Sequence, residues 1–517
     1  MSALLRSMLL LVVLLSIACG HGAVARKAES GPREGQSATP LAPDQVVLRT
    51  SDAAIVELRV VFEAGSADDP AGHEGLTYVT VRSMLEGGAG GLSYPERVAQ
   101  LFPMAAEISG RVDREQIVLV GRVHLDHVAA FYPLFRDVIL HPMFERPTFE
   151  RVRERARASL MQGLRGGDDE QLGKELLQWM LFERQPLGHP ALGLSRSLAR
   201  LTASDLSAQW SRIICAGRVR VAAAGPISPE LKEALLRDLS SLRRPECTTS
   251  REPTESPRPP RRMWIVEKPS ASAVAISVGL PLDVRRGDPD YPALVLAAAY
   301  LGQHRTFAGR LMQKIRVDRG MNYGDYAYAE HFEEASGTRF PGPNVARSHQ
   351  YFSLWLRPLA PEQAQFALRL AVRELSGLLE RGMSEQDFAR IREFALNYFA
   401  LFEQTEQMRL GNALDDLFYC GGGRHLNRLL SAFRGLTAER VNEVVARRLK
   451  LDALQIAVVA PDGAAFVRQS LASDAATPVY ASEKPAPIRD EDREVSRYSL
   501  RLSEDRTLVI PVEQVFQ

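Results

Sequence analysis

An arginine and a tyrosine seven residues apart, Arg316 and Tyr323, are the residues of this chain best suited to chemistry. A guanidinium is a permanently charged fork of N–H donors, and a phenol can donate a hydrogen bond to a carbonyl oxygen or to a developing oxyanion. The apolar pattern predicts a helix over residues 308–316, and Arg319-Gly320 is a suitable place for that helix to stop. On spacing alone the stronger interpretation is structural: Arg316 would cap its own helix, and Tyr323 would be half-buried at the start of a strand.

Histidines and carboxylates occur close together at a few places, but none of these predicts a metal site. The run His124-Leu125-Asp126-His127 straddles the end of a predicted strand and the start of a helix, so the two imidazoles need not face the same way. Asp126 is better explained as the N-cap of that helix. Two further groups are expected to be turn or solvated loop residues: His73-Glu74, and His331 with Glu333 and Glu334.

The elements that must position these residues fall into two blocks. Residues 26–44 are rich in Gly, Ser, Pro and charge and predict a flexible tether, and folded sequence begins near Gln45. Residues 243–262 hold five prolines and almost nothing apolar, which predicts a linker between domains. We therefore expect one domain over 45–242, a second over 263–465, and a C-terminal extension over 466–517 whose place the pattern does not indicate.

The two blocks show the same order of predicted strands and helices. The first has strands over 46–48 and 54–62, helices from Gly75 and over 94–101, a strand over 116–121, helices over 126–139 and 149–164, and a strand over 219–224. The second has a strand over 273–280, helices over 291–301 and 308–316, a strand over 349–356, helices over 361–380 and 385–402, and a strand over 455–459. This is a coarse repeat of about 200 residues, and it predicts an α+β sandwich in each block.

The approach to the first long helix resembles the active site of the insulinase/pitrilysin (M16) peptidases. It runs from the turn Gly65–Glu74 into Gly75-Leu76, which opens an apolar helix. In that family the helix has the inverted zinc motif H-x-x-E-H, whose two histidines share a metal and whose glutamate activates water. On this resemblance the three motif positions fall on Tyr78, Val81 and Arg82. Valine cannot accept a proton, and an arginine places a fixed cation where Zn²⁺ should lie.

The family's third zinc ligand, a glutamate some 75 residues later, is also missing. The matching stretch, residues 156–164, contains no carboxylate. Two runs nearby look like family signposts and support the alignment: His141-Pro142-Met143-Phe144 and Gln185-Pro186-Leu187-Gly188-His189-Pro190. The resemblance therefore implies no metal on this chain.

The second block keeps a family signature. The stretch Leu301–Arg316 leads into Val317–Gly324, and it resembles the family segment in which a helix ends, a turn follows, and an arginine and a tyrosine hold the substrate backbone across the active site from the zinc. The matching residues are Arg316 and Tyr323. The resemblance covers roughly residues 45–465, and it implies a tandem repeat of two homologous α+β domains, each an antiparallel-rich sheet packed against helices.

Composition and the N-terminus bound the setting. A formal net charge of +1 argues against nucleic acid as the main partner, and no interior segment has the roughly 20 uninterrupted apolar residues of a membrane span. Arg6 precedes an apolar run, so residues 1–25 predict a signal peptide or a lipoprotein signal with lipidation at Cys19. The four cysteines are far apart and indicate neither a disulfide framework nor a zinc site. We expect an exported protein of a bacterial cell envelope, periplasmic or attached to the membrane only through a lipid anchor.

Some M16 enzymes divide the active site between two subunits, one with zinc and one with the arginine and tyrosine. The resemblance implies that this chain is of the second kind. It would be inert alone, would pair with a zinc-bearing homologue, and would hold peptide for the partner's zinc-bound hydroxide. Two alternatives stay open: a non-catalytic binding or assembly protein, and an active peptidase with a relocated metal site.

Overall fold

The computed structural model describes residues 46–214, 219–240, 242, 258–333, 340–419, 424–474, 477–480 and 482–517. All of these belong to one compact unit, Pro40–Gln517. The predicted signal segment 1–25 with Cys19, the tether 26–44 and most of the linker 243–262 lie outside the described residues. Among the described helices, none is long and apolar enough to cross a membrane.

The first half contains a sheet of five strands in the order β1-β5-β2-β4-β3. Pairing is parallel between β1 and β5 and antiparallel elsewhere. The strands are rich in Val, Ile and Ala, as strands buried on both faces usually are. Their bounds are β1 Val46–Thr50, β2 Ile55–Phe62, β3 Glu107–Val112, β4 Ile117–His124 and β5 Val219–Gly225.

The second half repeats this sheet strand for strand. Its order is β11-β6-β10-β7-β9-β8, so β6, β7, β8, β9 and β10 occupy the places of β1, β2, β3, β4 and β5, with the one parallel pair again at the corresponding position. The bounds are β6 Arg262–Glu267, β7 Val274–Leu282, β8 Asp325–Tyr328, β9 Gln350–Leu359, β10 Gln455–Ala460 and β11 Thr507–Pro511. The predicted tandem α+β repeat is confirmed.

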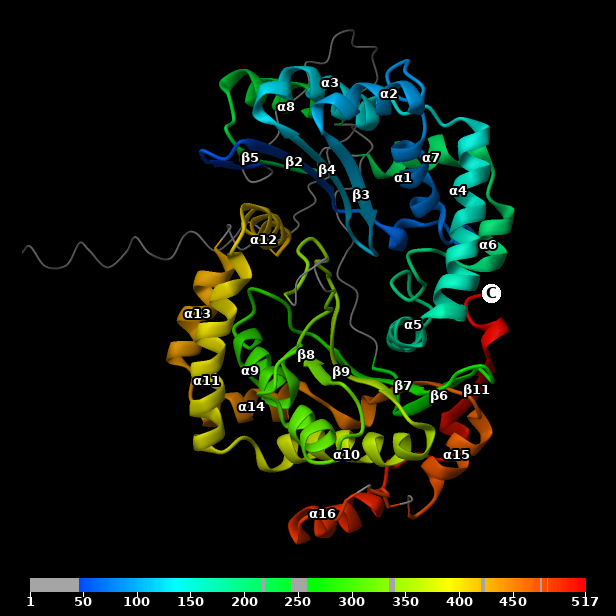
Figure 1. Ribbon diagram of the computed structural model, residues 1–517, viewed down its shortest axis with the longest axis vertical. Coiled ribbons are helices and arrows are strands. Elements are labelled where there is room, and N and C mark those ends of the chain that lie inside the picture. Colours follow the sequence, from blue (N-terminus) through cyan, green and yellow to red (C-terminus); the bar gives the residue numbers. More distant parts are fainter. Residues whose placement is uncertain are drawn as a thin grey trace, which may run out of the picture. The chain divides into compact units, whose positions relative to one another are not determined.

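Helices pack against both sheets (Figure 1). In the first half they are α1 Leu76–Glu86, α2 Tyr94–Leu101, α3 Val128–Leu140, α4 Arg146–Ala158, α5 Asp169–Leu181, α6 Ser195–Arg200, α7 Ala203–Ile213 and α8 Pro229–Ser240. In the second half they are α9 Tyr291–Gly302, α10 Pro361–Arg381, α11 Glu385–Phe399, α12 Glu406–Phe418, α13 His425–Gly435, α14 Ala438–Arg448, α15 Gly463–Leu471 and α16 Ala486–Ser496.

Two of the predicted helices are shorter than expected. The helix predicted over 149–164 ends as α4 at Ala158, and residues Ser159–Gly167 continue in a wider π-helical turn. Three glycines in this stretch weaken the α-helical preference. The helix predicted over 385–402 ends at Phe399, where a tighter 3₁₀ turn follows.

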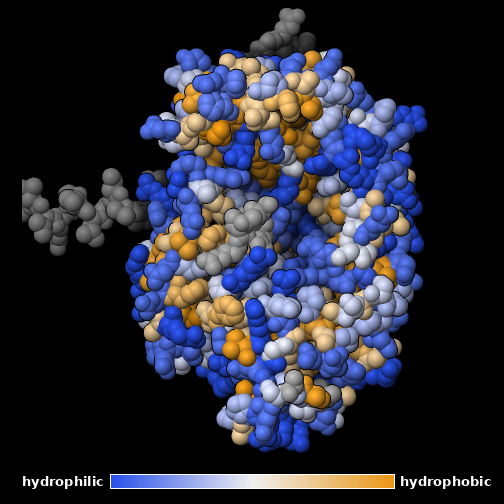
Figure 2. Space-filling view, in the orientation of Figure 1, coloured by the Kyte–Doolittle hydropathy of each residue, from blue (hydrophilic) through white to orange (hydrophobic). Residues whose placement is uncertain are grey.

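The two halves exchange a helix. Helix α5 of the first half packs on β7 and β10 of the second sheet, and α12 of the second half packs on β5 and β1 of the first. Leu177 of α5 packs closely on the backbone of β7 at Gly279, where a Cβ would lie 3.1 Å from the leucine side chain. On the face shown in Figure 2, apolar residues gather over the strands of the first sheet.

The C-terminal extension belongs to the second half. Strand β11 adds to the edge of the second sheet, parallel to β6, and α16 packs on α10. The chain then ends against the first half, where the carbonyl oxygen of Phe516 accepts hydrogen bonds from Arg165 at 2.9 Å and from the Ser195 amide at 3.0 Å.

A buried hairpin tip also fixes the two halves to each other. The residues that join β3 to β4, Asp113 to Gln116, are all buried, and Asp113, Glu115 and Gln116 bind the segment 346–348. Arg347, only 1% exposed, places Nη2 2.7 Å from Oδ1 of Asp113. Burial alone would raise the pKa of Asp113, but the charge of Arg347 outweighs it and holds that pKa well below its usual range.

We expect Arg347→Ala to lower the free energy of unfolding by about 3–5 kcal/mol, because it leaves the Asp113 carboxylate buried without its partner. Arg146→Ala is the control: Arg146 makes an exposed ion pair within α4, and such pairs contribute roughly 0.5 kcal/mol or less. Urea unfolding measures both. Equal losses for the two variants would show that the hairpin tip does not hold the halves together.

Candidate functional site

Helix α1 begins where the half-buried carboxylate of Asp69 caps it. Asp69 accepts hydrogen bonds from the amides of Gly75 and Thr77, each at 2.7 Å. Gly75 has φ of 100°, which favours glycine, and a Cβ there would lie 2.7 Å from the carbonyl oxygen of Leu192. Burial raises the pKa of Asp69 to about 7. These contacts fix where α1 starts and therefore which way its side chains point.

The three motif positions on α1 have different surroundings. Val81 is fully buried in the apolar core of the first half. Tyr78 is partly buried and packs against two core clusters. The side chain of Arg82 is 33% exposed and binds Glu86, one helical turn later, at 2.6 Å. Neither an apolar core side chain nor a guanidinium can bind Zn²⁺.

Three arginines surround Glu86. Besides Arg82, Arg151 and Arg155 of α4 place their Nη1 atoms 2.5 and 2.7 Å from its Oε2. Burial opposes the charge of Glu86, yet the hydrogen bonds and charges of these arginines lower its pKa. The cluster therefore has three cations and one anion beside the position where the sequence resemblance places a metal.

The stretch matched to the third zinc ligand contributes to the core. Ala156, Leu160 and Leu164 of this stretch are buried. Among the residues that the structure describes, no group of three or more His, Cys, Asp or Glu side chains is arranged to hold a metal ion.

The histidine groups lie apart from any such arrangement. His124 and His127 have ring centroids 6.4 Å apart. The prediction that Asp126 is a helix N-cap is wrong: the imidazole of His124 caps a 3₁₀ turn by accepting the Asp126 amide at 3.3 Å, and α3 starts at Val128. This happens because the turn reaches the helix two residues after Asp126.

The polar loop after β8 also differs from expectation. His331 is half-buried, and its Nδ1 lies 3.0 Å from the Tyr351 hydroxyl, so it is not solvated surface. Burial holds the pKa of His331 well below its ordinary value. Glu333 forms a 2.8 Å ion pair with Arg111 of β3, and Glu334 lies outside the described residues.

Arg316 and Tyr323 lie together on one turn. Arg316 is in the π-helical segment Met312–Val317, and its Nη1 donates to the carbonyl oxygen of Tyr323 at 3.0 Å. Its guanidinium carbon lies 5.1 Å from the ring centroid of Phe307 and 5.9 Å from that of Tyr323. Tyr323 is 79% exposed rather than half-buried, so its hydroxyl is open to a ligand. Their role in binding peptide stays a prediction.

A buried carboxyl group lies just beyond this turn. Asp325, at the start of β8, is fully buried, and its Oδ1 accepts from the Asn322 amide at 2.7 Å. Burial raises the pKa of Asp325 to about 8. Asn322 also donates to the carbonyl oxygen of Arg357 at 3.2 Å, which ties the turn to β9.

A cavity of about 650 Å³ lies between the halves. Tyr78 of α1 lines it, and so do Tyr326, Phe332 and Trp355 of the second half. Lys174 of α5 places its ammonium 3.8 Å from the centroid of the Trp355 ring. Arg316 and Tyr323 are not among the residues that line this cavity, so it joins Tyr78 to the second half without the exposed turn.

A buried histidine, His304, lines the same cavity, although no sequence pattern indicated it. His304 places Nδ1 2.5 Å from the Tyr328 hydroxyl. Burial lowers the pKa of His304 to about 3, and the nearby charges of Arg305, Lys174 and Arg357 act in the same direction. It is therefore neutral near pH 7. Its place in a predicted helix-to-loop segment gave no signal that it would face a cavity.

Comparisons with known proteins agree on the family. Residues 200–394 match a model described as the peptidase M16 inactive domain. A Helicobacter pylori protein named non-peptidase homolog YmxG is 23% identical over 63% of this chain and 70% of its own length. A Bacillus subtilis protein named uncharacterized zinc protease YmxG is 20% identical over 71% of this chain and 84% of its own length. A Pseudomonas fluorescens structure titled peptidase M16 inactive domain matches with a TM-score of 0.70 and 20% identity over 83% of this chain and 98% of that one.

These matches support an M16 relationship, by sequence over residues 200–394 and by fold over most of the chain. The sequence resemblance assigns the motif positions to Tyr78, Val81 and Arg82 of α1, outside the matched range 200–394, and this assignment stays a prediction. The relatives include proteins named as zinc proteases and one named as a non-peptidase, so family membership alone does not say whether a member is active.

A glutamate at position 81, where the zinc motif has one, should destabilise α1 rather than supply a catalytic base. We expect Val81→Glu to cost about 3 kcal/mol or more, because a carboxylate would enter an apolar core with no partner. Val98→Glu on α2 is the control, since Val98 is 42% exposed. Denaturant midpoints measure both variants. If Val81→Glu is as stable as the control, α1 does not pack as described.

Stability should depend on pH through Asp325. Its folded pKa of about 8 exceeds the unfolded value near 3.8, so between these values folding takes up a proton and stability falls as pH rises. Asp325→Asn removes this slope while keeping the Asn322 contact. Between pH 5 and pH 7 the variant should gain about 2–3 kcal/mol relative to the parent. The control is Asp490→Asn at an exposed position, and its free energy of unfolding should change with pH as that of the parent does in the same urea titrations. If the free energy of unfolding of Asp325→Asn also changes with pH as that of the parent does, Asp325 is ionised in the folded state.

Proposed function

We propose that this protein is the non-zinc-binding subunit of a two-subunit M16 peptidase and holds peptide for a zinc-bearing homologue. Arg316 and Tyr323 would bind the peptide backbone. The partner's zinc would supply the hydroxide that attacks the scissile carbonyl. This chain needs no cofactor of its own in that role, and zinc is expected on the partner.

One contrast supports this proposal above all. At two of the zinc-motif positions the chain has Val81 in the core and Arg82 in a cluster of three arginines with Glu86. At the substrate positions Tyr323 is 79% exposed, with Arg316 against its ring. A protein without any function in peptide cleavage would be expected to lose both the zinc-motif residues and the substrate-binding residues. A dedicated substrate-binding subunit would lose only the zinc-motif residues.

The names of relatives support the inactive half of the proposal. The matching family model is described as an inactive domain, and the Helicobacter pylori relative is named a non-peptidase homolog. We propose further that the chain is exported to a bacterial envelope, with Cys19 as a lipid anchor or with release into the periplasm. Mass spectrometry of the mature N-terminus distinguishes these two forms.

Reconstitution with a zinc-bearing homologue tests the proposal. This chain alone should cleave no peptide, and the mixture should. Arg316→Ala and Tyr323→Phe should each lower kcat/KM of the mixture by about 10- to 1,000-fold, as loss of one well-placed donor does. Peptide cleavage followed by fluorescence measures the effect.

The matched controls are Arg493→Ala and Tyr94→Phe, which change an exposed arginine on α16 and a partly exposed tyrosine on α2. Both should leave the rate unchanged. If the mixture with Arg316→Ala cleaves as fast as the parent mixture, the role assigned to Arg316 is wrong.

The two alternatives give different results. An assembly or binding protein would form a stable complex that hydrolyses nothing, with or without Arg316. A peptidase with a relocated metal site would contain stoichiometric zinc and cleave peptide without a partner, which metal analysis of the purified chain detects.

A further inference from the structure

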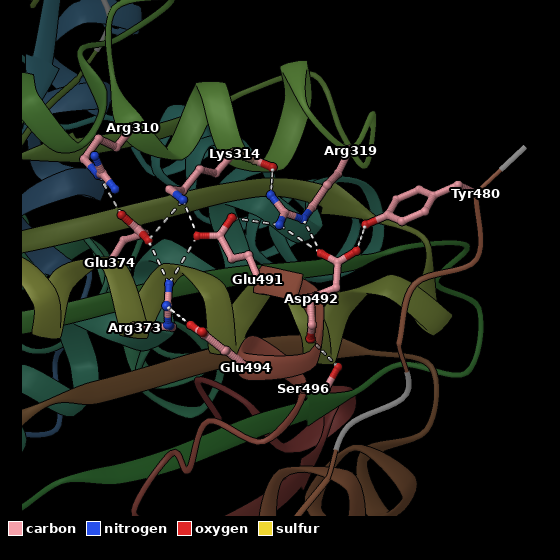
Figure 3. Close-up of polar contacts among 10 residues, drawn as sticks. All are labelled: Arg310, Lys314, Arg319, Arg373, Glu374, Tyr480, Glu491, Asp492, Glu494 and Ser496. Atoms are coloured by element: carbon pink, nitrogen blue, oxygen red, sulfur yellow. Dashed lines mark hydrogen bonds and ion pairs between the residues drawn. The ribbon is translucent and has the colours of Figure 1, made fainter. Parts of the chain in front are cut away.

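The C-terminal extension makes direct contact with the turn that contains Arg316 and Tyr323. Arg319, whose side chain is fully buried, places Nη2 2.9 Å from Oε2 of Glu491 and Nε 2.9 Å from Oδ1 of Asp492. Lys314 pairs with Glu491 as well. Both acidic residues are on α16, and both cations flank Arg316 in the sequence. Figure 3 shows these contacts converging from α16 onto the segment above it.

Arg319 also makes a hydrogen bond within the turn. Arg319 donates through Nη1 to the carbonyl oxygen of Lys314 at 2.8 Å, spanning Arg316 on its inner side. The outer side faces solvent: Val317 is 52% and Tyr323 79% exposed. The turn therefore has one face held by α16 and one face free for a ligand.

Helix α16 is itself held firmly. Arg369 of α10 is fully buried and donates to four carbonyl oxygens, those of Gln469 and Ala472 at the end of α15 and of Ser496 and Tyr498 at the end of α16, at 2.8–3.1 Å. Tyr480 donates to Asp492 at 2.9 Å. Charged hydrogen bonds that are excluded from water are strong and geometrically specific, so α16 has little conformational freedom.

The segment being held has a rare backbone conformation. Residues Met312–Val317 form a π-helical turn, in which the Asp318 amide reaches back to the carbonyl oxygen of Gln313 at 2.8 Å. Gly320, with φ of 69°, then reverses the chain. A π-turn is a rare conformation that surrounding contacts must stabilise, and it is common at functional sites.

We propose that α16 is a clamp that positions the Arg316–Tyr323 turn for peptide, with Glu491 and Asp492 as its positioning residues. The inference rests on the proposed function for its purpose, because it assigns the extension to the same substrate-binding turn. The two acidic residues touch no peptide themselves. They act through Lys314 and Arg319, which fix the backbone on both sides of Arg316.

The test compares two variants with the same change in charge. Glu491→Gln with Asp492→Asn neutralises both carboxylates in the three ion pairs to the turn, those of Glu491 with Lys314 and Arg319 and of Asp492 with Arg319, and keeps the side-chain shapes. Asp490→Asn with Glu494→Gln removes two carboxylates from the same helix that pair only with Arg493 and Arg373. Both are made in the full chain.

Amide hydrogen exchange measures the clamp without a partner. The amides of Asp318, Gly320 and Met321, which donate within the turn, serve as probes, and β7 reports global opening. We expect roughly tenfold faster exchange at the probes in the first variant, with β7 unchanged, and no change in the second. Unchanged probe exchange, or an equal rise in β7, would overturn the clamp. Should the first variant fail to fold, Lys314→Met makes the same comparison from the turn side.

Activity of the complex with the zinc-bearing homologue separates this inference from the proposed function. The first variant should raise KM about tenfold with little change in kcat, because a mobile turn binds peptide less well, and Glu491→Asp should restore part of the loss. Faster exchange without any kinetic change would uphold the clamp and contradict the role given to Arg316 and Tyr323. Slower cleavage without faster exchange would contradict the clamp and leave that role intact.

Discussion

The structure depends on two charges buried face to face between its halves. Desolvating Arg347 and Asp113 costs more than an ordinary contact returns, so the pair is stable only where further hydrogen bonds satisfy its surroundings. The structure supplies them: Gln116 accepts from the Ala346 amide at 2.9 Å, and Glu115 accepts from the Ser348 amide at 2.7 Å. With the hairpin tip held in this way, the exchanged helices α5 and α12 can each cover a sheet of the opposite half, and the cavity between the halves has fixed walls.

The same electrostatic reasoning explains the motif helix. A metal site needs lone pairs and an excess of negative charge, whereas α1 and α4 bring three guanidinium groups to one carboxylate at Glu86. This arrangement is stable because the arginine head groups stay partly in water while the glutamate is neutralised. The packing of α1 and α4 therefore adds positive charge at the position where the sequence resemblance places a metal, beside the substitutions at Tyr78, Val81 and Arg82.

The second half shows the opposite design. Its turn exposes the ring of Tyr323 to solvent, with the guanidinium of Arg316 beside it. This arrangement is unfavourable by itself, because apolar surface stays exposed and the side chains lose conformational freedom. The inner side of the turn is held by buried ion pairs with α16, and α16 in turn is held by Arg369. Helix α16, which lies outside the repeated domain, therefore stabilises this exposed turn.

The sequence determined the repeated strands and helices, because alternation and helical periodicity are local: α2 and the start of α9 lie where the pattern placed them. The residue types at the three motif positions of the resemblance, Tyr78, Val81 and Arg82, are likewise plain from the sequence. It did not indicate α5 or α12, which pack across the halves, or the burial of His331 and the elevated pKa of Asp325. The place of the extension also came only from the tertiary structure. These features depend on which surfaces meet, and that is decided by burial and charge pairing summed over residues far apart in the chain, for which no local pattern exists.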